Sequence, residues 1–303
     1  MTQMLASPAE RANWRQYLKL CKPKVVLLII FTSLVGMLLA TDSFPSWQVL
    51  IVGNLGIGLA AASGAAINHY VDQRIDAVME RTKSRPLPSG GISSVNALVF
   101  AVGLCAISMW MLVLYINLLT ALLTLLSVIG YAIVYTMFLK RTTPHNIVLG
   151  GAAGAAPPVL GWAAVTGEVN TEALLLFLII FVWTPPHFWA LAIRRRKEYA
   201  KAGVPMLPVT HGVEFTKSQI LLYTLLLLIV TLVPFVIDMT GHIYLAGAIG
   251  LGCMFVYHSW KLYRGKNDEH AMKTFAYSIV YLNGLFVFLL IDHYARLLFR
   301  SVM

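Results

Sequence analysis

The chain has 303 residues, of which 58% are hydrophobic and only 12% are charged. This composition excludes an ordinary soluble domain and a disordered chain, and it indicates a polytopic membrane protein. The net charge of +10 does not indicate nucleic-acid binding. Lys and Arg gather beside the apolar segments, where membrane topology and anionic lipid account for them.

Residues 1–24 are predicted to form a cytoplasmic amphipathic segment, because aromatic and basic side chains alternate before Pro23 turns the chain inward. The alternative is a solvated tail that only sets the topology. We expect no cleaved signal peptide, since the first apolar run begins at Val25 after charged residues and lacks a small-residue cleavage site. Residues 25–303 are predicted to form a single integral-membrane domain.

Nine apolar runs are long enough to cross a membrane as helices, and none shows the short alternating pattern of β-barrel strands. We therefore predict an all-α bundle of about nine transmembrane helices. The runs are residues 25–40, 49–67, 97–115, 118–139, 147–165, 173–193, 220–237, 243–262 and 275–298.

Basic side chains are distributed unevenly over the connections between these runs. The segment before the first run and the loops after the second, fourth, sixth and eighth are rich in Lys and Arg, whereas the alternate connections have none. The positive-inside rule then predicts a cytoplasmic N-terminus. Arg296 and Arg300, at the far end of the last run, depart from this pattern, and we expect them at the lipid headgroups.

Asn68, Asp72 and Asp76 follow the second apolar run at four-residue steps, and we call them the polar stripe. In an α-helix each such step turns the side chain by about 40° and rises about 6 Å, so the three share one face. Carboxylates in a membrane helix are costly and rarely kept for packing, so the stripe is a candidate functional site. The alternative is a solvated network with neighbouring Arg side chains. We expect Asp72, at a wet helix mouth, to lack a partner.

The polar stripe suits a magnesium ion, because Mg²⁺ prefers oxygen ligands and keeps part of its shell for water or phosphate. Arg81, Lys83 and Arg85 follow the stripe and are predicted to contact phosphate oxygens. The pattern predicts a magnesium-bridged diphosphate whose apolar tail runs into the bundle. Candidates for an aromatic lining of the tail, with packing as the alternative, are Tyr70, Tyr131, Tyr135, Phe188 and Trp189.

The two longest polar loops follow the second and sixth runs and so lie on the same membrane face. We call residues 72–91 the first arm and residues 198–208 the second arm; each carries acids, bases and a turn with Gly and Pro. We expect the substrate site between the arms, at the cytoplasmic mouth. Gly150, Gly151 and Gly154 open the fifth run and are predicted to serve close helix packing.

The sequence Asn-His-Tyr-Val-Asp-Gln-Arg-Ile-Asp at residues 68–76, followed by Met-Glu-Arg-Thr-Lys-Ser-Arg-Pro-Leu-Pro, resembles the first signature of the UbiA-type intramembrane prenyltransferases. Three further stretches, residues 143–158, 183–192 and 199–209, resemble the members of that family that farnesylate protoheme IX. The resemblance covers nearly the whole chain.

The resemblance implies a UbiA-like fold and a reaction in which farnesyl diphosphate, with Mg²⁺ as cofactor, alkylates a vinyl group of protoheme IX and water adds to give heme O. It implies a multi-pass protein of the bacterial inner membrane with its active site on the cytoplasmic side. As partners it implies heme A synthase or a heme-copper terminal oxidase. Two other functions remain open: prenyl transfer to a quinone-precursor aromatic acid, and transport of phosphorylated or lipid-linked anions.

The resemblance also implies roles for individual residues. Glu198 would join the polar stripe as a metal ligand, although the family usually has Asp there and the longer acid has a different reach. His187 would touch the porphyrin, as an iron ligand or by positioning the vinyl edge, with a core histidine as the alternative. It follows Pro185 and Pro186, where we expect a broken helix to line a cavity. The implied catalytic residues are Asp72, Asp76, His187, Glu198 and Tyr199. The implied substrate-binding residues are Asn68, Arg81, Lys83, Arg85, Lys140, Arg141, Asn146 and Lys201.

Overall fold

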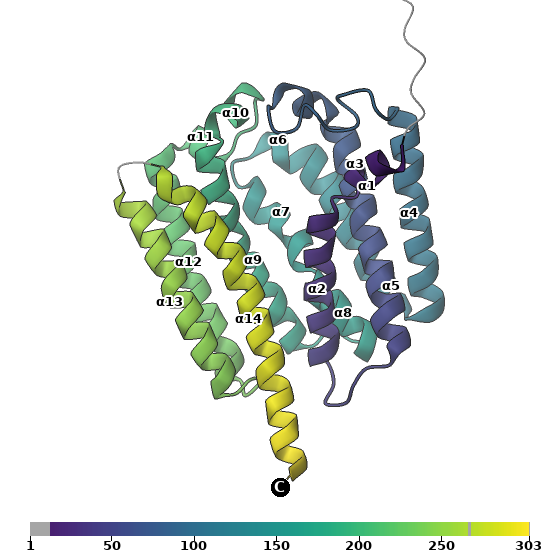
Figure 1. The fold of residues 1–303 in the computed structure, drawn as a ribbon, viewed down its shortest axis with the longest axis vertical. Helices are drawn as coiled ribbons and strands as arrows, with labels where there is room; N and C mark the ends of the chain where they lie inside the picture. Colours follow the sequence, from purple (N-terminus) through teal and green to yellow (C-terminus); the bar gives the residue numbers. More distant parts are fainter. Residues whose placement is uncertain (1–12, 266–267, 303) are drawn as a thin grey trace, which may run out of the picture.

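The computed structural model describes residues 13–265 and 268–302, and nearly all of them lie in a bundle of long helices (Figure 1). Over these residues the chain forms no β-strand. Within the described ranges, eight helical segments are long and apolar enough to cross a membrane, and a bent helix pair, counted as one span, gives a ninth. The predicted all-α membrane bundle is confirmed. The part of the predicted amphipathic segment at residues 1–12 lies outside the described residues.

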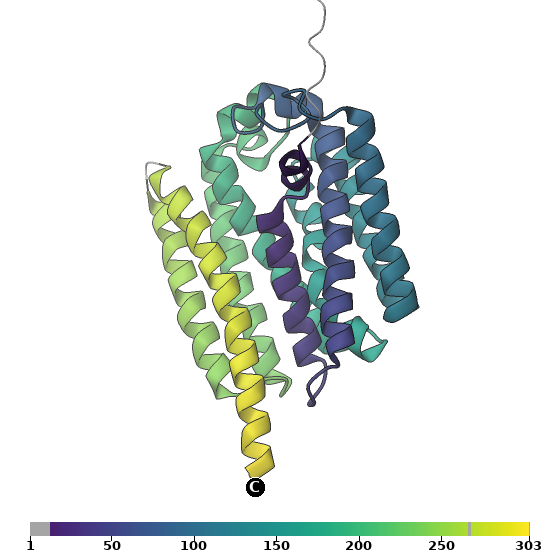
Figure 2. The ribbon, with the colours of Figure 1, turned by 45° about the vertical axis from the view of Figure 1, so that its right-hand side comes forward.

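The bent pair consists of α1 (Trp14–Leu20) and α2 (Pro23–Leu39), which meet at 53°. A residue before proline is disfavoured in the right-handed helical region, and Lys22 instead adopts a left-handed conformation with φ of 49°. The break at Lys22 leaves α1 at the end of the bundle that carries both arms, while α2 runs down into the bundle (Figure 2).

The polar stripe occupies the last part of α3 (Asn54–Val78), which continues from a single π-helical turn, η1 (Val49–Gly53). The next helix, α4 (Ser94–Tyr115), packs along α3. Two hydroxyls cross this interface: Ser63 Oγ donates to the Ala101 carbonyl at 2.7 Å, and Ser108 Oγ donates to the Gly56 carbonyl at 2.6 Å. In an apolar surrounding such bonds satisfy the hydroxyl groups and hold neighbouring helices together.

The fourth predicted span is not a uniform α-helix. It begins as α5 (Leu118–Ile129), widens into a ten-residue π-helix, η2 (Gly130–Leu139), and ends in the short α6 (Lys140–Thr142). Thr136 Oγ1 donates to the Tyr131 carbonyl at 2.8 Å within the π-helix. Because π-helical turns shift the register of the following side chains, η2 decides which residues face α3.

The fifth predicted span is two helices, α7 (Asn146–Ala155) and α8 (Pro157–Thr166), which divide at Pro157. Helix α8 packs closely against α2: a Cβ on Gly36 would lie 2.2 Å from the Pro158 carbonyl oxygen, and one on Gly161 would lie 2.0 Å from that of Ser33. Only glycine allows these two backbones to touch.

The second half of the chain contains α9 (Thr171–Arg194), the two short helices of the second arm and three more long helices. These are α10 (Arg196–Lys201), α11 (Leu207–Thr210), α12 (Val213–Val236), α13 (His242–Arg264) and α14 (Glu269–Val302). The expected break at Pro185 and Pro186 is absent, since α9 continues through both. Packing against neighbouring helices offsets the loss of their two N–H donors.

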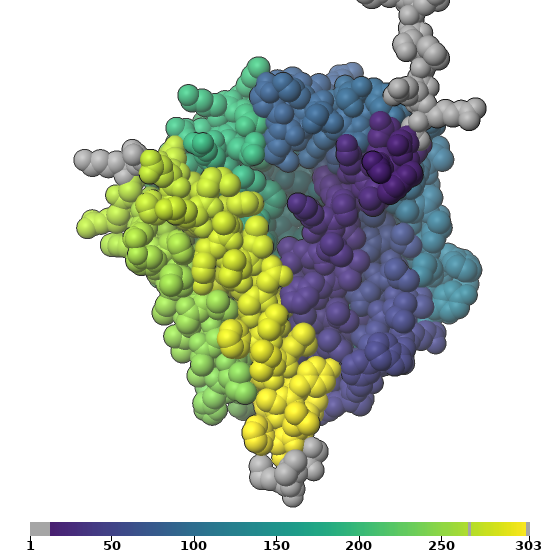
Figure 3. Space-filling model, in the orientation of Figure 1, coloured from purple at the N-terminus to yellow at the C-terminus, as the bar shows by residue number. Residues whose placement is uncertain are grey.

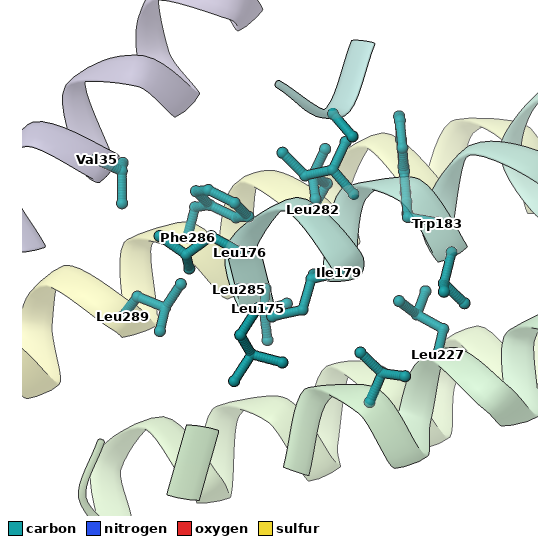
Figure 4. Close-up of a cluster of buried hydrophobic side chains, with 14 of the residues drawn as sticks. Val35, Leu175, Leu176, Ile179, Trp183, Leu227, Leu282, Leu285, Phe286 and Leu289 are labelled. Atoms are coloured by element: carbon teal, nitrogen blue, oxygen red, sulfur yellow. The ribbon is translucent and has the colours of Figure 1, made fainter. Parts of the chain in front are cut away.

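A buried apolar cluster fixes α9 against α12, α14 and α2 (Figure 4). Leu176 and Ile179 of α9 and Leu285 of α14 are completely buried in it, and Val35 of α2 joins it. Both arms lie at one end of the bundle and the C-terminus lies at the other (Figures 1 and 2). Towards the arms, the surface is hollowed between the N-terminal helices and α14 (Figure 3).

Candidate functional site

The three residues of the polar stripe are all buried, and Asp72 has only 1% of its surface exposed. Asp72 Oδ2 accepts a hydrogen bond from Asn68 Nδ2 at 2.8 Å and forms an ion pair with Lys140. The expectation that Asp72 lacks a partner is therefore wrong. A buried carboxylate without a counterion is costly, and the π-helix η2 leads the chain to Lys140, directly beside it.

Asp76 pairs with residues farther along the first arm. Arg85 Nη1 donates to Asp76 Oδ2 at 2.7 Å, and Thr82 Oγ1 donates to the Asp76 carbonyl at 3.0 Å. The arm therefore folds back over the end of α3 and holds the Arg85 guanidinium next to the polar stripe, as the alternative of a network with neighbouring Arg side chains requires.

Lys22 is a site residue that the sequence interpretation missed. Its Nζ donates to Asn68 Oδ1 at 2.6 Å, and Asn68 Nδ2 also donates to Thr136 Oγ1 at 3.3 Å. The sequence pattern assigns Lys22 to membrane topology, with the other basic residues before the first apolar run. The signal that could have identified it is its position immediately before Pro23, at the end of α1. With Lys140 and Arg85, it brings three cations to the stripe.

The second arm places Glu198 and Tyr199 on α10. Arg195 Nη1 donates to Glu198 Oε1 at 3.1 Å, and Glu198 Oε2 is buried without a hydrogen-bond partner. Burial raises the pKa of the Tyr199 phenol, while the positive charges of Arg81 and Arg195 act in the opposite direction. Tyr199 therefore remains a neutral hydroxyl donor at physiological pH, with Arg81 of the first arm as an electrostatic neighbour.

Asn146 and Arg141 also lie around the stripe. Asn146 is completely buried, its Nδ2 donates to the Lys140 carbonyl at 3.4 Å, and its Oδ1 has no partner. Arg141 Nη2 donates to the Val71 carbonyl at 3.2 Å, so it braces the helix end from outside.

Two of the predicted substrate-binding cations make no hydrogen bond or ion pair to the stripe. Lys83 forms an exposed pair with Glu80 at 2.6 Å, because the two are three residues apart on one turn of the first arm. Lys201 is exposed at the end of α10. The structure brings neither cation to the polar stripe.

The residues of the stripe fit a hard divalent cation, but the predicted ligand set is not gathered as a whole. Within the described part of the chain, no three His, Cys, Asp or Glu side chains lie close enough together to hold a metal. Glu198 therefore does not complete a cluster with Asp72 and Asp76. Asp72 Oδ1 and Asn146 Oδ1 remain as buried acceptors without partners. Such unsatisfied oxygens call for a ligand, and oxygen is the donor that Mg²⁺ prefers.

Tyr131 and Tyr135 of η2 form an aromatic wall near the stripe. Their rings are stacked with centroids 5.7 Å apart, and both lie within electrostatic range of Asp72. Gly150 of α7 makes room for this pair, because a Cβ there would lie 2.1 Å from a Tyr135 ring carbon. Of the other glycines predicted to serve packing, a Cβ on Gly151 would meet a neighbour at 3.0 Å and one on Gly154 would meet nothing.

The other three aromatic candidates have other surroundings. Tyr70 packs against the buried cluster around Leu20, Trp189 is buried with its ring edge-on to Tyr223, and Phe188 is exposed on the side of α9. For Tyr70 and Trp189 the packing alternative is confirmed.

His187 is held firmly between α9 and α14. Its ring is stacked on Trp183 and Phe275 at centroid distances of 4.3 and 4.6 Å, and its Nδ1 lies 2.7 Å from Ser278 Oγ. Ser278 Oγ donates its one hydrogen to the Phe275 carbonyl at 2.6 Å. Nδ1 must then be the donor to Ser278, which leaves the lone pair of a neutral ring on Nε2.

The chain matches the model of the UbiA prenyltransferase family over residues 29–288. It is 60% identical over 298 residues to a protoheme IX farnesyltransferase of Thioalkalivibrio sulfidiphilus, covering 98% of this chain and 99% of that protein. It is 61% identical over 294 residues to a protoheme IX farnesyltransferase of Nitrosococcus oceani, covering 97% and 98% of the two chains.

Solved structures share the fold at low sequence identity. One described as digeranylgeranylglyceryl phosphate synthase has a TM-score of 0.78 at 20% identity, over 92% of this chain and 98% of its own. A UbiA homolog from Archaeoglobus fulgidus bound to DMAPP and Mg²⁺ has a TM-score of 0.62 at 18% identity, over 90% and 99% of the two chains. At these identities the likeness establishes the fold alone.

Proposed function

Because the chain belongs to the UbiA prenyltransferase family, we propose that it transfers the farnesyl group of farnesyl diphosphate to a vinyl group of protoheme IX and so makes heme O. The observation that carries this proposal is the identity of about 60%, over nearly the whole of both chains, to proteins named protoheme IX farnesyltransferase. The polar stripe, its three cations and the aromatic pair supply the side chains that such a reaction needs.

The diphosphate binds between the two arms. Arg85 and Lys140 pair with the carboxylates of the stripe, Lys22 donates to the Asn68 amide, and in the complex all three turn to phosphate oxygens. Arg presents a planar fork for two oxygens at once, whereas Lys acts as a point charge. Tyr199 adds a neutral hydroxyl donor from the second arm. Lys83 and Lys201 do not contact the polar stripe, and they contribute long-range positive charge at the cytoplasmic mouth of the site.

Asn68, Asp72 and Asp76 are the residues that would hold magnesium. Glu198 would lie near the part of the diphosphate that the second arm binds. When bound, Mg²⁺ supplies a Lewis acid that stabilises negative charge on the leaving diphosphate. The protein holds these oxygens in position and shields them from bulk water, because Asn68 donates to Asp72 and all three stripe residues are buried.

The bond between C1 of the farnesyl chain and the diphosphate oxygen breaks, and its electron pair leaves with the diphosphate. Tyr131 and Tyr135 flank the position where the allylic cation forms, and the negative faces of aromatic rings stabilise a cation. The vinyl group supplies an electron pair to C1, so the new carbon–carbon bond forms at its terminal carbon. Water adds to the remaining porphyrin-side cation and loses one proton to the released diphosphate, which leaves the hydroxyl of heme O.

His187 positions the porphyrin. The bond from Nδ1 to Ser278 and the stacking on Trp183 and Phe275 fix the ring plane and leave the Nε2 lone pair free. A neutral imidazole held in this way is suited to ligate the heme iron. The hollow beside α14 in Figure 3 offers a route of entry from the membrane, next to the helix that contacts His187.

The reaction site faces the cytoplasm of a bacterium, and the protein is a component of the inner membrane. The arms lie at the end of the bundle where Lys and Arg are concentrated, which supports this orientation by the positive-inside rule. The product would pass to a heme A synthase or a heme-copper terminal oxidase.

The proposal is tested by incubating the purified protein with farnesyl diphosphate, reduced hemin and Mg²⁺, and analysing the porphyrin by mass spectrometry. The expected product carries one farnesyl group and one added water. Quinone-precursor aromatic acids are offered in parallel reactions. Turnover of such an acid without change of the porphyrin would reassign the acceptor, and release of intact diphosphate across a vesicle membrane without any transfer would indicate a transporter.

A further inference from the structure

A second pocket lies at the end of the bundle opposite the arms, with a volume of about 260 Å³. It is formed where α2, α8, α9 and α14 end, together with the turn between α12 and α13. The pocket adjoins the buried apolar cluster of the interior. Three residues of its wall belong to that cluster or pack against it: Leu39, Trp162 and Met239. The diphosphate site makes no use of it.

Acids and bases line this pocket together without forming ion pairs. Asp42, Glu172 and Asp238 contribute carboxylates, and His293, Arg296 and Arg300 contribute basic groups. None of the six takes part in any of the salt bridges found over residues 13–265 and 268–302. Charges of opposite sign that share a pocket but stay apart leave room for a ligand between them.

The side chains that could bind such a ligand have unused hydrogen-bonding capacity. Arg296 donates only to the Asp238 carbonyl, at 3.2 Å from both terminal nitrogens, and the side chains of Asp42, Glu172 and Arg300 make no hydrogen bond to any described residue. His293 Nε2 is 3.2 Å from the Thr41 carbonyl.

Trp162 contributes its large ring to the wall of this pocket and is only 6% exposed.

We propose that this pocket binds the headgroup of a zwitterionic phospholipid with a primary amine, such as phosphatidylethanolamine. Arg296 and Arg300 bind the phosphate, while Asp42 and Glu172 accept hydrogen bonds from the ammonium group. The pocket lies at the level of the lipid headgroups, since it is formed by the ends of membrane-spanning helices. An anionic lipid fits less well, because three carboxylates line the same pocket. The site also explains why two Arg residues occur on the face that otherwise has no Lys or Arg.

Native mass spectrometry of the purified protein, titrated with phosphatidylethanolamine or phosphatidylglycerol, tests this site. The wild-type protein is expected to retain phosphatidylethanolamine in preference. Arg300→Gln is expected to reduce that retention about tenfold, the effect of losing one charge-assisted hydrogen bond. Asp42→Asn combined with Glu172→Gln is expected to shift the preference towards phosphatidylglycerol. The matched control is Lys261→Gln with Arg264→Gln, which removes two exposed cations from the other membrane face and should leave the retention of phosphatidylethanolamine unchanged.

Equal loss of lipid in the control and in Arg300→Gln would overturn the proposal, as would stronger retention of phosphatidylglycerol by the wild-type protein. Zinc protoporphyrin is titrated in parallel. If Arg300→Gln weakened porphyrin binding and left phosphatidylethanolamine unaffected, the pocket would belong to a propionate-bearing ligand and the lipid assignment would be wrong.

Discussion

Lys22 Nζ donates a hydrogen bond to Asn68 Oδ1 across 2.6 Å, and this contact joins the break between α1 and α2 to the polar stripe on α3. Lys22 has a left-handed backbone at this break, where the following proline disfavours the right-handed helical region, and its side chain enters the site instead of lying along the membrane surface. The N-terminal helices therefore contribute a side chain to the polar stripe.

Replacing Lys22 by Gln is expected to raise the KM for farnesyl diphosphate about tenfold, because one charge-assisted contact to the diphosphate is lost. Lys24→Gln is the matched control, since Lys24 lies two residues away and is exposed. Steady-state kinetics with varied farnesyl diphosphate measures both. Equal KM values in the two variants would show that Lys22 serves topology alone.

Asp72→Asn is expected to lower turnover by about a hundredfold or more while the protein stays folded, because the amide keeps the shape and one acceptor but loses the charge. Asp72→Ala should in addition lower the free energy of unfolding by about 1–3 kcal/mol, since it leaves the buried partners Lys140 and Asn68 unsatisfied. Thermal unfolding in detergent and product formation separate the two effects. Near-normal turnover in Asp72→Asn would remove the metal assignment.

Gly150→Ala is expected to displace the Tyr135 ring and to destabilise the protein by about 1–3 kcal/mol, with a matching fall in transfer rate. Gly154→Ala is the control on the same helix, because a Cβ there meets no atom within 4 Å. A comparison of melting temperature and turnover checks this prediction. If both variants behaved alike, the aromatic pair would have no special role.

His187→Ala is expected to abolish the spectral change on adding hemin, while farnesyl diphosphate still binds. Ser278→Ala should retain heme binding but weaken it, because the ring loses the acceptor that fixes its tautomer. Absorbance titrations with hemin, alongside calorimetry with farnesyl diphosphate, distinguish these outcomes. Unchanged heme spectra in His187→Ala would favour the packing role of a core histidine.

Much of the fold could be predicted from the sequence, because apolar runs of about 20 residues have few alternatives to a membrane helix. Asn68, Asp72 and Asp76 share a helix face as their four-residue spacing requires, and the pairing of Arg85 with Asp76 matches the alternative in which the stripe pairs with neighbouring Arg side chains. These features depend on contacts within one helix and its following loop.

The features that were missed depend on contacts between distant segments. The resemblance implied Lys140 as a substrate-binding residue, but its ion pair with Asp72 was not predicted; it follows the π-helix η2, a state that no pattern in residues 130–139 indicated. Lys22 reaches Asn68 only through a left-handed backbone at the α1–α2 break. The family resemblance implied Glu198 as a metal ligand. In the structure it pairs with Arg195, three residues earlier in the chain, and the resemblance did not indicate this pair.

The most direct test of the central claim is calorimetric titration of the protein with a non-reactive farnesyl thiodiphosphate, with and without Mg²⁺. We predict tight binding in the presence of Mg²⁺, weak binding in its absence, and loss of the magnesium dependence when Asp72 and Asp76 are both replaced by Asn. Equally tight binding without any divalent cation, or an unchanged magnesium dependence in the double variant, would contradict the assignment of the polar stripe to a magnesium-bridged diphosphate.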